Sequence, residues 1–257
     1  ISKENGEIVG ATHRFGPYYF DYDAPTYTSA EIKNVTNTGY DVYAYGVGDA
    51  LTGIGFAASP TWTDYNGQDD IDSNWSNPNL STVKGSDQGN GTWYFRVNTS
   101  AHNEEEGYYN THVYIYDGAG NYTVIELRTF VDKTAPTISV DISSCTWRNS
   151  ALSVTITVTD PISNGSNSGL SEGNSYIYYL SGGTWTQYAN GVAISLNPGV
   201  SGTYYLVVNS VKDNAGNTSE SKQFGPYYFD YIAPSAGEFS ISATYTNQSS
   251  ITLYVTG

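Results

Sequence analysis

The sequence has no methionine, one cysteine and few basic side chains. Ten Lys and Arg stand against 25 Asp and Glu in 257 residues, which gives a net charge of −15. Nucleic acids and anionic membranes are held by Lys and Arg, so we expect neither as a partner. Cys145 has no second cysteine to pair with, which excludes a disulfide framework. We expect its side chain to act as a small buried apolar group.

Membrane-spanning runs and targeting signals are missing as well. No stretch resembles a membrane-spanning helix or a signal peptide, so we expect no membrane insertion. The absence of methionine indicates that the native start lies elsewhere. Export without disulfides favours a Gram-positive bacterial surface or a secreted location.

What the sequence does contain is an internal repeat. The octapeptide Phe-Gly-Pro-Tyr-Tyr-Phe-Asp-Tyr occurs at Phe15–Tyr22 and again at Phe224–Tyr231, each time followed by x-Ala-Pro. A third Ala-Pro junction ends at Pro136. The three prolines, Pro25, Pro136 and Pro234, are 111 and 98 residues apart. These separations are ordinary domain sizes, so they predict two whole modules.

The repeat also predicts a partial module at each end. We expect the closing strands of a truncated module at 1–26, a first whole module at 27–136, a second at 137–235, and the opening strands of a further module at 236–257. One hypothesis is that the two partial modules complete a single sandwich that contains both Phe15–Tyr22 and Ile251–Val255. Such a pairing, within one chain or between neighbours, would hide two open sheet edges.

Apolar residues alternate with a period of two, and helical periodicity is nearly absent. Leu152–Thr159 and Trp93–Asn98 are clear examples. Each whole module also carries an Asp-x-Ala-Gly-Asn hairpin, at 117–121 and at 213–217. The pattern predicts an all-β fold of tandem immunoglobulin-like β-sandwich modules with proline-containing linkers. Tyr204 is a candidate for a tyrosine corner.

Several of these motifs resemble known bacterial repeats. The Asp-x-Ala-Gly-Asn hairpin and its Ala-Pro linker resemble bacterial immunoglobulin-like repeats, over about residues 137–234. The first module resembles the Bsp-like repeat of Gram-positive surface proteins through Gly39–Val42, Pro60–Trp62, Asn66–Ile71, His102 and Tyr109–Tyr114. The stacking of modules also resembles immunoglobulin-binding superantigen-like surface proteins of gut bacteria.

The resemblance implies an extracellular protein, attached to the cell wall or secreted, with no defined catalytic residues. It leaves three functions open. The segment binds an extracellular host glycoprotein, with immunoglobulin the leading candidate; or it is the passive spacer of an adhesin; or it targets a wall hydrolase to wall polysaccharide. We expect no enzyme, because no nucleophile elbow is present and no module has the size of a hydrolase barrel.

A long stretch between Pro60 and Thr92 lacks strand alternation. Loops beyond about 12–15 residues are usually functional or disordered, and the two Trp in this stretch argue against simple disorder. It forms either a binding surface or a cap over one end of the sandwich. The candidate ligand-binding residues are Trp62, Tyr65, Asn66, Gln68, Asp69, Asp70, Trp75, Tyr43, Tyr45, Tyr114 and Tyr116.

The four strand tyrosines in this set have two interpretations. Tyrosine gives a large contact area and a hydroxyl, which suits protein recognition. It is also simply a favoured residue on sheet surfaces. If both strand faces point outward, the pairs Tyr43 and Tyr45, and Tyr114 and Tyr116, form one aromatic stripe.

Metal sites find little support in the ligand spacing. The oxygen-rich run Asp64–Asp72 places its glycine too early for an EF-hand loop and has Trp75 at the twelfth position. His102, Glu104–Glu106 and His112 lack the spacing of zinc ligands. We therefore expect no cofactor and no transition metal. Weak calcium binding stays open at four carboxylates, Asp64, Asp69, Asp70 and Asp72.

Overall fold

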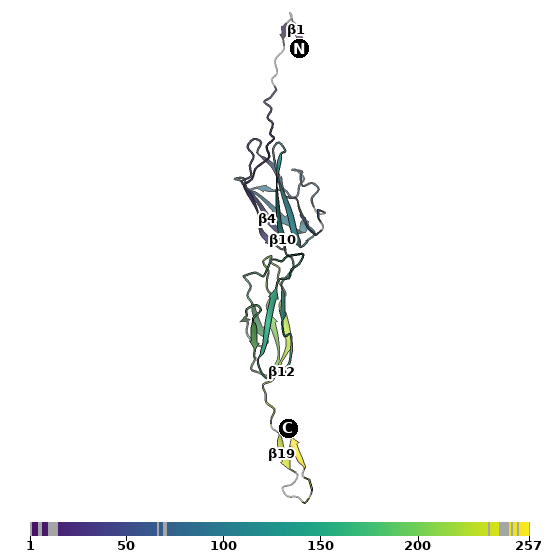
Figure 1. Cartoon of the computed structure of the whole chain (residues 1–257), viewed down its shortest axis with the longest axis vertical. Coiled ribbons are helices and arrows are strands. Elements are labelled where there is room, and N and C mark those ends of the chain that lie inside the picture. Colours follow the sequence, from purple (N-terminus) through teal and green to yellow (C-terminus); the bar gives the residue numbers. More distant parts are fainter. Residues whose placement is uncertain are drawn as a thin grey trace. The chain divides into compact units, whose positions relative to one another are not determined.

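The computed structural model describes residues 2–4, 7–9, 15–65, 67–68, 71–235, 237–241, 247, 249–250 and 252–256. The chain divides into two compact units (Figure 1). The first unit contains Ile1–Thr134 and Ile162–Ser168, and the second contains Ala135–Pro161 and Gly169–Gly257.

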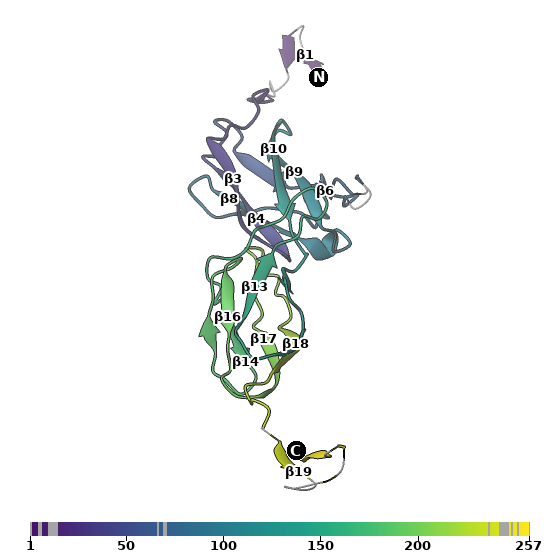
Figure 2. The ribbon, with the colours of Figure 1, turned by 60° about the horizontal axis from the view of Figure 1, so that its bottom comes forward.

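Two antiparallel sheets form the sandwich of the first unit (Figure 2). One sheet has the order β3-β4-β8-β7, and the other has the order β10-β9-β5, with β6 also paired to β9. The bounds are β3 (Ser29–Thr36), β4 (Gly39–Tyr45), β5 (Ile54–Ala58), β6 (Thr61–Thr63), β7 (Ser86–Asp87), β8 (Trp93–Asn98), β9 (Gly107–Asp117) and β10 (Tyr122–Val131).

The core of the first unit follows from the alternation of these strands. Val42, Phe95, Val113 and Ile115 point between the sheets and are almost completely buried. The one helical element among the described residues is the 3-10 turn η1 (Thr99–Ala101). The other face of each sheet is therefore free to carry polar and aromatic side chains.

The second unit is also a sandwich of two sheets. Its smaller sheet has the order β11-β13-β16, and its larger sheet has the order β12-β18-β17-β14-β15. The bounds are β11 (Thr137–Val140), β12 (Cys145–Arg148), β13 (Leu152–Thr159), β14 (Ile177–Leu180), β15 (Thr186–Gln187), β16 (Ala193–Leu196), β17 (Gly202–Val208) and β18 (Lys222–Phe229). Because β16 and β15 end their sheets, both sheets have an open edge in this unit.

Each unit contains a tyrosine corner. The Tyr204 hydroxyl donates to the Val200 carbonyl oxygen at 2.9 Å, four residues upstream, as the sequence predicts. In the first unit the Tyr109 hydroxyl donates to the Glu105 carbonyl oxygen at 2.7 Å, with the same separation. The all-β fold with tandem immunoglobulin-like sandwiches is confirmed. Cys145 is half-buried and packs against the core of the second unit.

The two copies of the octapeptide have different structures. Phe224–Tyr231 contains most of β18, where Tyr227 and Phe229 are fully buried. Phe15–Tyr22 forms no strand, and its large aromatic side chains are exposed. Two hairpins complete the described strands: β1 (Ser2–Glu4) with β2 (Glu7–Val9), and β19 (Glu238–Ile241) with β20 (Leu253–Thr256). Joint folding of Phe15–Tyr22 with Ile251–Val255 stays a prediction, and residue 251 lies outside the described residues.

Candidate functional site

The outer face of β9 carries a row of aromatic side chains. Along this strand Tyr109, Val113 and Ile115 point into the core, so the alternate residues His112, Tyr114 and Tyr116 point outward. The Tyr114 and Tyr116 rings are stacked with their centroids 6.3 Å apart, and His112 lies 6.5 Å from Tyr114. The alternation of a single strand therefore sets three rings in line.

Neighbouring strands extend this row on both sides. From β6, Trp62 contacts His112 at 4.6 Å between ring centroids. From β5, Phe56 stacks on Tyr116 at 5.9 Å, directly opposite it in the strand register. From β10, Tyr122 lies 5.4 Å from Tyr116, its register partner across the hairpin. We call the surface formed by these residues and one more from the insertion the aromatic face: Phe56, Trp62, Trp75, His112, Tyr114, Tyr116 and Tyr122.

The insertion after β6 is docked against this surface. Its Trp75 ring lies 4.4 Å from the ring of Tyr114. The end of the insertion runs along β5, where the Ser59 amide donates to the Val83 carbonyl and the Gly85 amide to the Ala57 carbonyl. The Lys84 ammonium lies 5.9 Å from the Phe56 ring centroid. The insertion thus covers part of the outer face of this sheet, while Trp75 itself stays half-exposed.

Asp72 holds the turn that presents Trp75. One carboxylate oxygen accepts the Asn74 amide at 2.8 Å, and the other accepts the amide of Thr82 at 2.9 Å and its hydroxyl at 2.7 Å. These bonds, led by the Thr82 amide, lower the pKa of Asp72. The Asp72 carboxylate oxygens therefore stabilise the fold of the insertion.

The remaining predicted residues of the insertion lie elsewhere or are not described. Tyr65 is 69% exposed and lines a separate cavity of about 290 Å³ with Asp64 and Tyr108. Asp64 is paired with Arg128, whose guanidinium nitrogen lies 2.5 Å from its carboxylate. Gln68 is exposed. Asn66, Asp69 and Asp70 lie outside the described residues, so the calcium expectation there stays a prediction.

Tyr43 and Tyr45 lie on the opposite sheet. They stack at 6.0 Å, Tyr94 joins them at 5.2 Å from Tyr43, and the Lys33 ammonium lies within 6 Å of both stacked rings. The predicted single stripe with Tyr114 is therefore wrong. Both pairs do point outward, but from different sheets of one sandwich, which face opposite sides.

The two histidines considered as zinc ligands are held in separate places. His102 is buried and packs edge-on against Tyr109 at 5.5 Å. His112 belongs to the aromatic face, and its Nε2 lies 3.8 Å from a carboxylate oxygen of Glu126. Glu104 is bound by Lys133 and Thr99.

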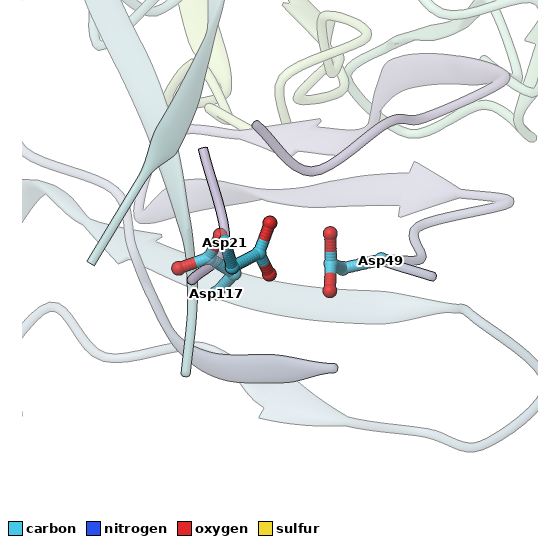
Figure 3. A group of neighbouring side chains, drawn as sticks. All are labelled: Asp21, Asp49 and Asp117. Carbon is cyan, nitrogen blue, oxygen red and sulfur yellow. The ribbon is translucent and has the colours of Figure 1, made fainter. Parts of the chain in front are cut away.

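Three aspartates that the sequence reasoning missed converge at one end of the first unit (Figure 3). Asp21 precedes β3, Asp49 follows β4 and Asp117 ends β9, and one carboxylate oxygen of each lies within 4.8 Å of the other two. These carboxylates are the described groups of the first unit that could together hold a hard cation such as Ca²⁺. A signal was present, because Asp117 opens the Asp-x-Ala-Gly-Asn hairpin and Asp21 stands in the octapeptide.

Backbone amides hold two of these carboxylates in place. Asp49 accepts the amides of Thr52, Leu51 and Gly53 at 2.7–3.0 Å, and these bonds, Thr52 first, lower its pKa. Asp117 accepts three successive amides of its hairpin at 2.6–2.8 Å. The same bonds fix the loop geometry, so the cluster has a structural role of its own.

Residues 29–130 match the family model of the GBS Bsp-like repeat. This segment resembles the Bsp-like repeat, as the sequence predicts. The match begins at β3 and ends within β10, so it contains both sheets of the first unit and the whole aromatic face. The match supports the interpretation of this segment as a repeat of a surface protein. The resemblance to superantigen-like proteins stays a prediction.

Solved structures of low sequence identity also align with the chain. A 1.5-MDa bacterial ice-binding adhesin, studied for its retention on host cell surfaces, has 14% identity and a TM-score of 0.42, over 85% of this chain and 69% of that one. A tetra-tandem repeat from the extending region of a large adhesion protein has 15% identity and a TM-score of 0.29, over 85% and 52%. DIP-gamma IG1+IG2 has 12% identity and a TM-score of 0.36, over 80% and 98%. No curated protein matches the chain.

Proposed function

We propose that this chain is a non-enzymatic binding segment of a bacterial surface protein, and that the aromatic face of its first unit holds an extracellular host protein. The observation that carries the proposal is the continuity of that face. Its rings pass from Trp62 to Phe56 through contacts of 4.6–6.5 Å, across β6, β9 and β5.

The chemistry of the face suits protein recognition. Large aromatic side chains on a sheet lose little conformational entropy on binding, and Tyr hydroxyls supply hydrogen bonds at the rim. Tyr122 is 53% exposed and Tyr114, Tyr116 and Trp75 are half-buried, so these four rings are held in position yet reachable, while Phe56 is buried and supports the face from below. The net charge of −15 attracts a basic partner and makes association depend on salt. Immunoglobulin is the first partner to test.

The match of residues 29–130 to the family model of a surface-protein repeat supports the proposal, because the whole face lies within that range. Within the described residues no helix is long and apolar enough to cross a membrane. The extracellular location, the absence of enzyme activity and the host glycoprotein partner are parts of the same proposal. The rival functions are those of a passive spacer and of a module that binds wall polysaccharide.

The test measures binding of the full chain to immunoglobulin, to proteins captured from serum and to purified peptidoglycan. Tyr122→Ala removes an exposed ring of the face, and Tyr65→Ala removes a more exposed ring from another part of the first unit, 69% against 53%. We expect Tyr122→Ala to weaken protein binding at least tenfold and Tyr65→Ala to leave it unchanged.

Three results would count against the proposal. An equal loss of protein binding in Tyr122→Ala and Tyr65→Ala would show that the aromatic face is not the specific binding site. Binding to peptidoglycan alone, with the same loss in Tyr122→Ala, would favour wall targeting. No binding to any of these partners would favour a spacer.

A further inference from the structure

The second unit contains a groove in a different place from the aromatic face. It has a volume of about 470 Å³, within the usual size range of small-ligand sites. It lies where the sandwich is open, between the end of β16 and the hairpin that joins β14 to β15. Tyr178 and Leu180 of β14 form one wall, and Leu196 of β16 lies on the other side.

The lining of this groove has no charged side chain among the described residues. The lack of charge distinguishes the groove from the rest of a chain that has 25 acidic side chains. A charged ligand would lose its water there without gaining an opposite charge. The groove therefore selects for an uncharged ligand.

Aromatic and aliphatic surface alternates with hydrogen-bonding groups around the groove. The Tyr204 ring is fixed by its hydroxyl bond to Val200 and by an edge-on contact with Phe229 at 5.9 Å. Asn197 accepts the Tyr231 hydroxyl through Oδ1 at 2.8 Å, which orients its amide, and no hydrogen bond within the described part of the chain uses its two Nδ2 protons. Ser195 and Thr184 add hydroxyls. Flat apolar rings beside amide and hydroxyl groups match a sugar, which has an apolar ring face and a hydroxyl edge.

The alternative occupant is an extended peptide that adds to the open edge of β16. The strand is only four residues long and is followed by Asn197-Pro198, and proline has no amide proton to offer. Strand addition depends on a row of backbone donors and acceptors. The groove offers its polar groups mainly on side chains, so a sugar fits it better.

We propose that this groove binds a neutral saccharide unit of a glycan, with Asn197 donating to ring or hydroxyl oxygens beside the Tyr178 and Tyr204 rings. The site is independent of the protein-binding face proposed above. One chain would then carry a protein site on its first unit and a glycan site on its second.

The experiment is a titration of the isotope-labelled full chain, followed by backbone amide signals. The probes are chitobiose, lactose and maltotriose, with glucuronic acid as the anionic sugar and a neutral Ser/Thr/Val heptapeptide as the extended peptide. We expect at least one neutral sugar to shift the amides of Gly182, Gly183 and residues 195–197 with saturable, millimolar-range affinity.

Asn197→Asp is the decisive variant, because the carboxylate can still accept from Tyr231 but has lost both Nδ2 donors. We expect it to weaken sugar binding about tenfold. Asn149→Asp is the matched control, an exposed asparagine of the same unit outside the groove, and should leave the affinity unchanged. A Tyr122→Ala chain should keep full sugar affinity, which separates this site from the aromatic face.

Four outcomes would overturn the proposal. They are no shift with any neutral sugar, equal binding of glucuronic acid, shifts along 193–196 with the heptapeptide alone, and an Asn197→Asp chain that binds sugar as the parent does.

Discussion

The Trp75 ring packs 4.4 Å from the Tyr114 ring, at a tilt of 43°. Trp75 comes from an insertion without regular strands, and Tyr114 from the middle of β9. The contact therefore joins a long loop to a strand that is paired on both sides. It gives Trp75 two roles, since the same ring anchors the insertion and forms part of the proposed binding face.

The first prediction separates these roles. Trp75→Ala should lower the free energy of unfolding of the first unit by about 0.5–1.5 kcal/mol, the usual worth of an aromatic pair. It should weaken partner binding by about 2 kcal/mol or more if Trp75 is an anchor. Urea unfolding and an affinity measurement on the same sample give both numbers. Trp147→Ala, which removes an exposed Trp of the second unit, is the control for binding. Lost stability with unchanged affinity would leave Trp75 with a structural role alone.

The second prediction concerns a buried polar contact in the first unit. The Tyr40 and Thr111 hydroxyls are 2.6 Å apart, and Thr111 also lies 3.0 Å from the Thr61 hydroxyl. Thr61 in turn donates to the Ser59 carbonyl. Thr111→Val should therefore cost about 1–3 kcal/mol of stability, because it removes the hydroxyl 2.6 Å from the fully buried Tyr40 hydroxyl.

A double-mutant cycle checks this assignment. Tyr40→Phe combined with Thr111→Val should cost clearly less than the sum of the single changes, since the second change removes the group that the first left unsatisfied. Strictly additive losses in urea unfolding would show that the two hydroxyls are not coupled.

Strands and their faces were predictable, because alternation is a local property. The hairpin at 117–121 sets Tyr122 opposite Tyr116, so the place of Tyr122 on the aromatic face could have been predicted from the sequence. The octapeptide shows the limit of prediction from local sequence. Most of Phe224–Tyr231 lies in β18, which pairs with β12 on one side and β17 on the other, whereas Phe15–Tyr22, with the same residues, is not in a strand.

The candidate site shows the same limit for contacts between segments. Trp62 and Tyr114 were selected as aromatic residues, but their common surface depends on the pairing of β6 and β5 with β9. Tyr43 and Tyr45 belong to a sheet that faces the other way, and no local pattern reveals which sheet a strand joins. The convergence of Asp21, Asp49 and Asp117 likewise comes from three distant segments.

The third prediction concerns acid stability. Burial acts to raise the pKa of Asp41, but hydrogen bonds from Asn34, Tyr94 and Arg96 outweigh it, and the pKa is lowered. A lowered folded-state pKa adds stability above the unfolded pKa of about 4, and this stability is lost as the pH falls through the folded value. Asp41→Asn should flatten the dependence of the urea midpoint on pH below about pH 4. A carboxyl titration of Asp41 by NMR that gave an ordinary or raised pKa would contradict this.

The fourth prediction concerns transition metals. Among the described residues of the first unit, the cluster that could hold a metal consists of Asp21, Asp49 and Asp117. It contains no His or Cys, the side chains that zinc prefers. A zinc-selective chelator should therefore leave the melting temperature of the full chain unchanged. A fall of many degrees that added zinc restores would contradict this prediction. Repeating the melt with a calcium chelator, in the parent and in Asp117→Asn, would report separately on the aspartate cluster.

The last prediction compares two tyrosines of the second unit by the same substitution. The Tyr188 hydroxyl is buried and has no hydrogen-bond partner among the described residues, and burial raises its pKa to about 12. It is therefore neutral and carries an uncompensated loss of hydration. Tyr188→Phe should raise the free energy of unfolding by about 1 kcal/mol, because it removes the unsatisfied group and keeps the ring between Tyr176 and Tyr178. Tyr204→Phe should lower it by about 1 kcal/mol, because it breaks the bond to the Val200 carbonyl. Urea unfolding of both variants beside the parent measures the two signs. A loss of stability in Tyr188→Phe would mean that its hydroxyl has a partner in solution, such as a buried water.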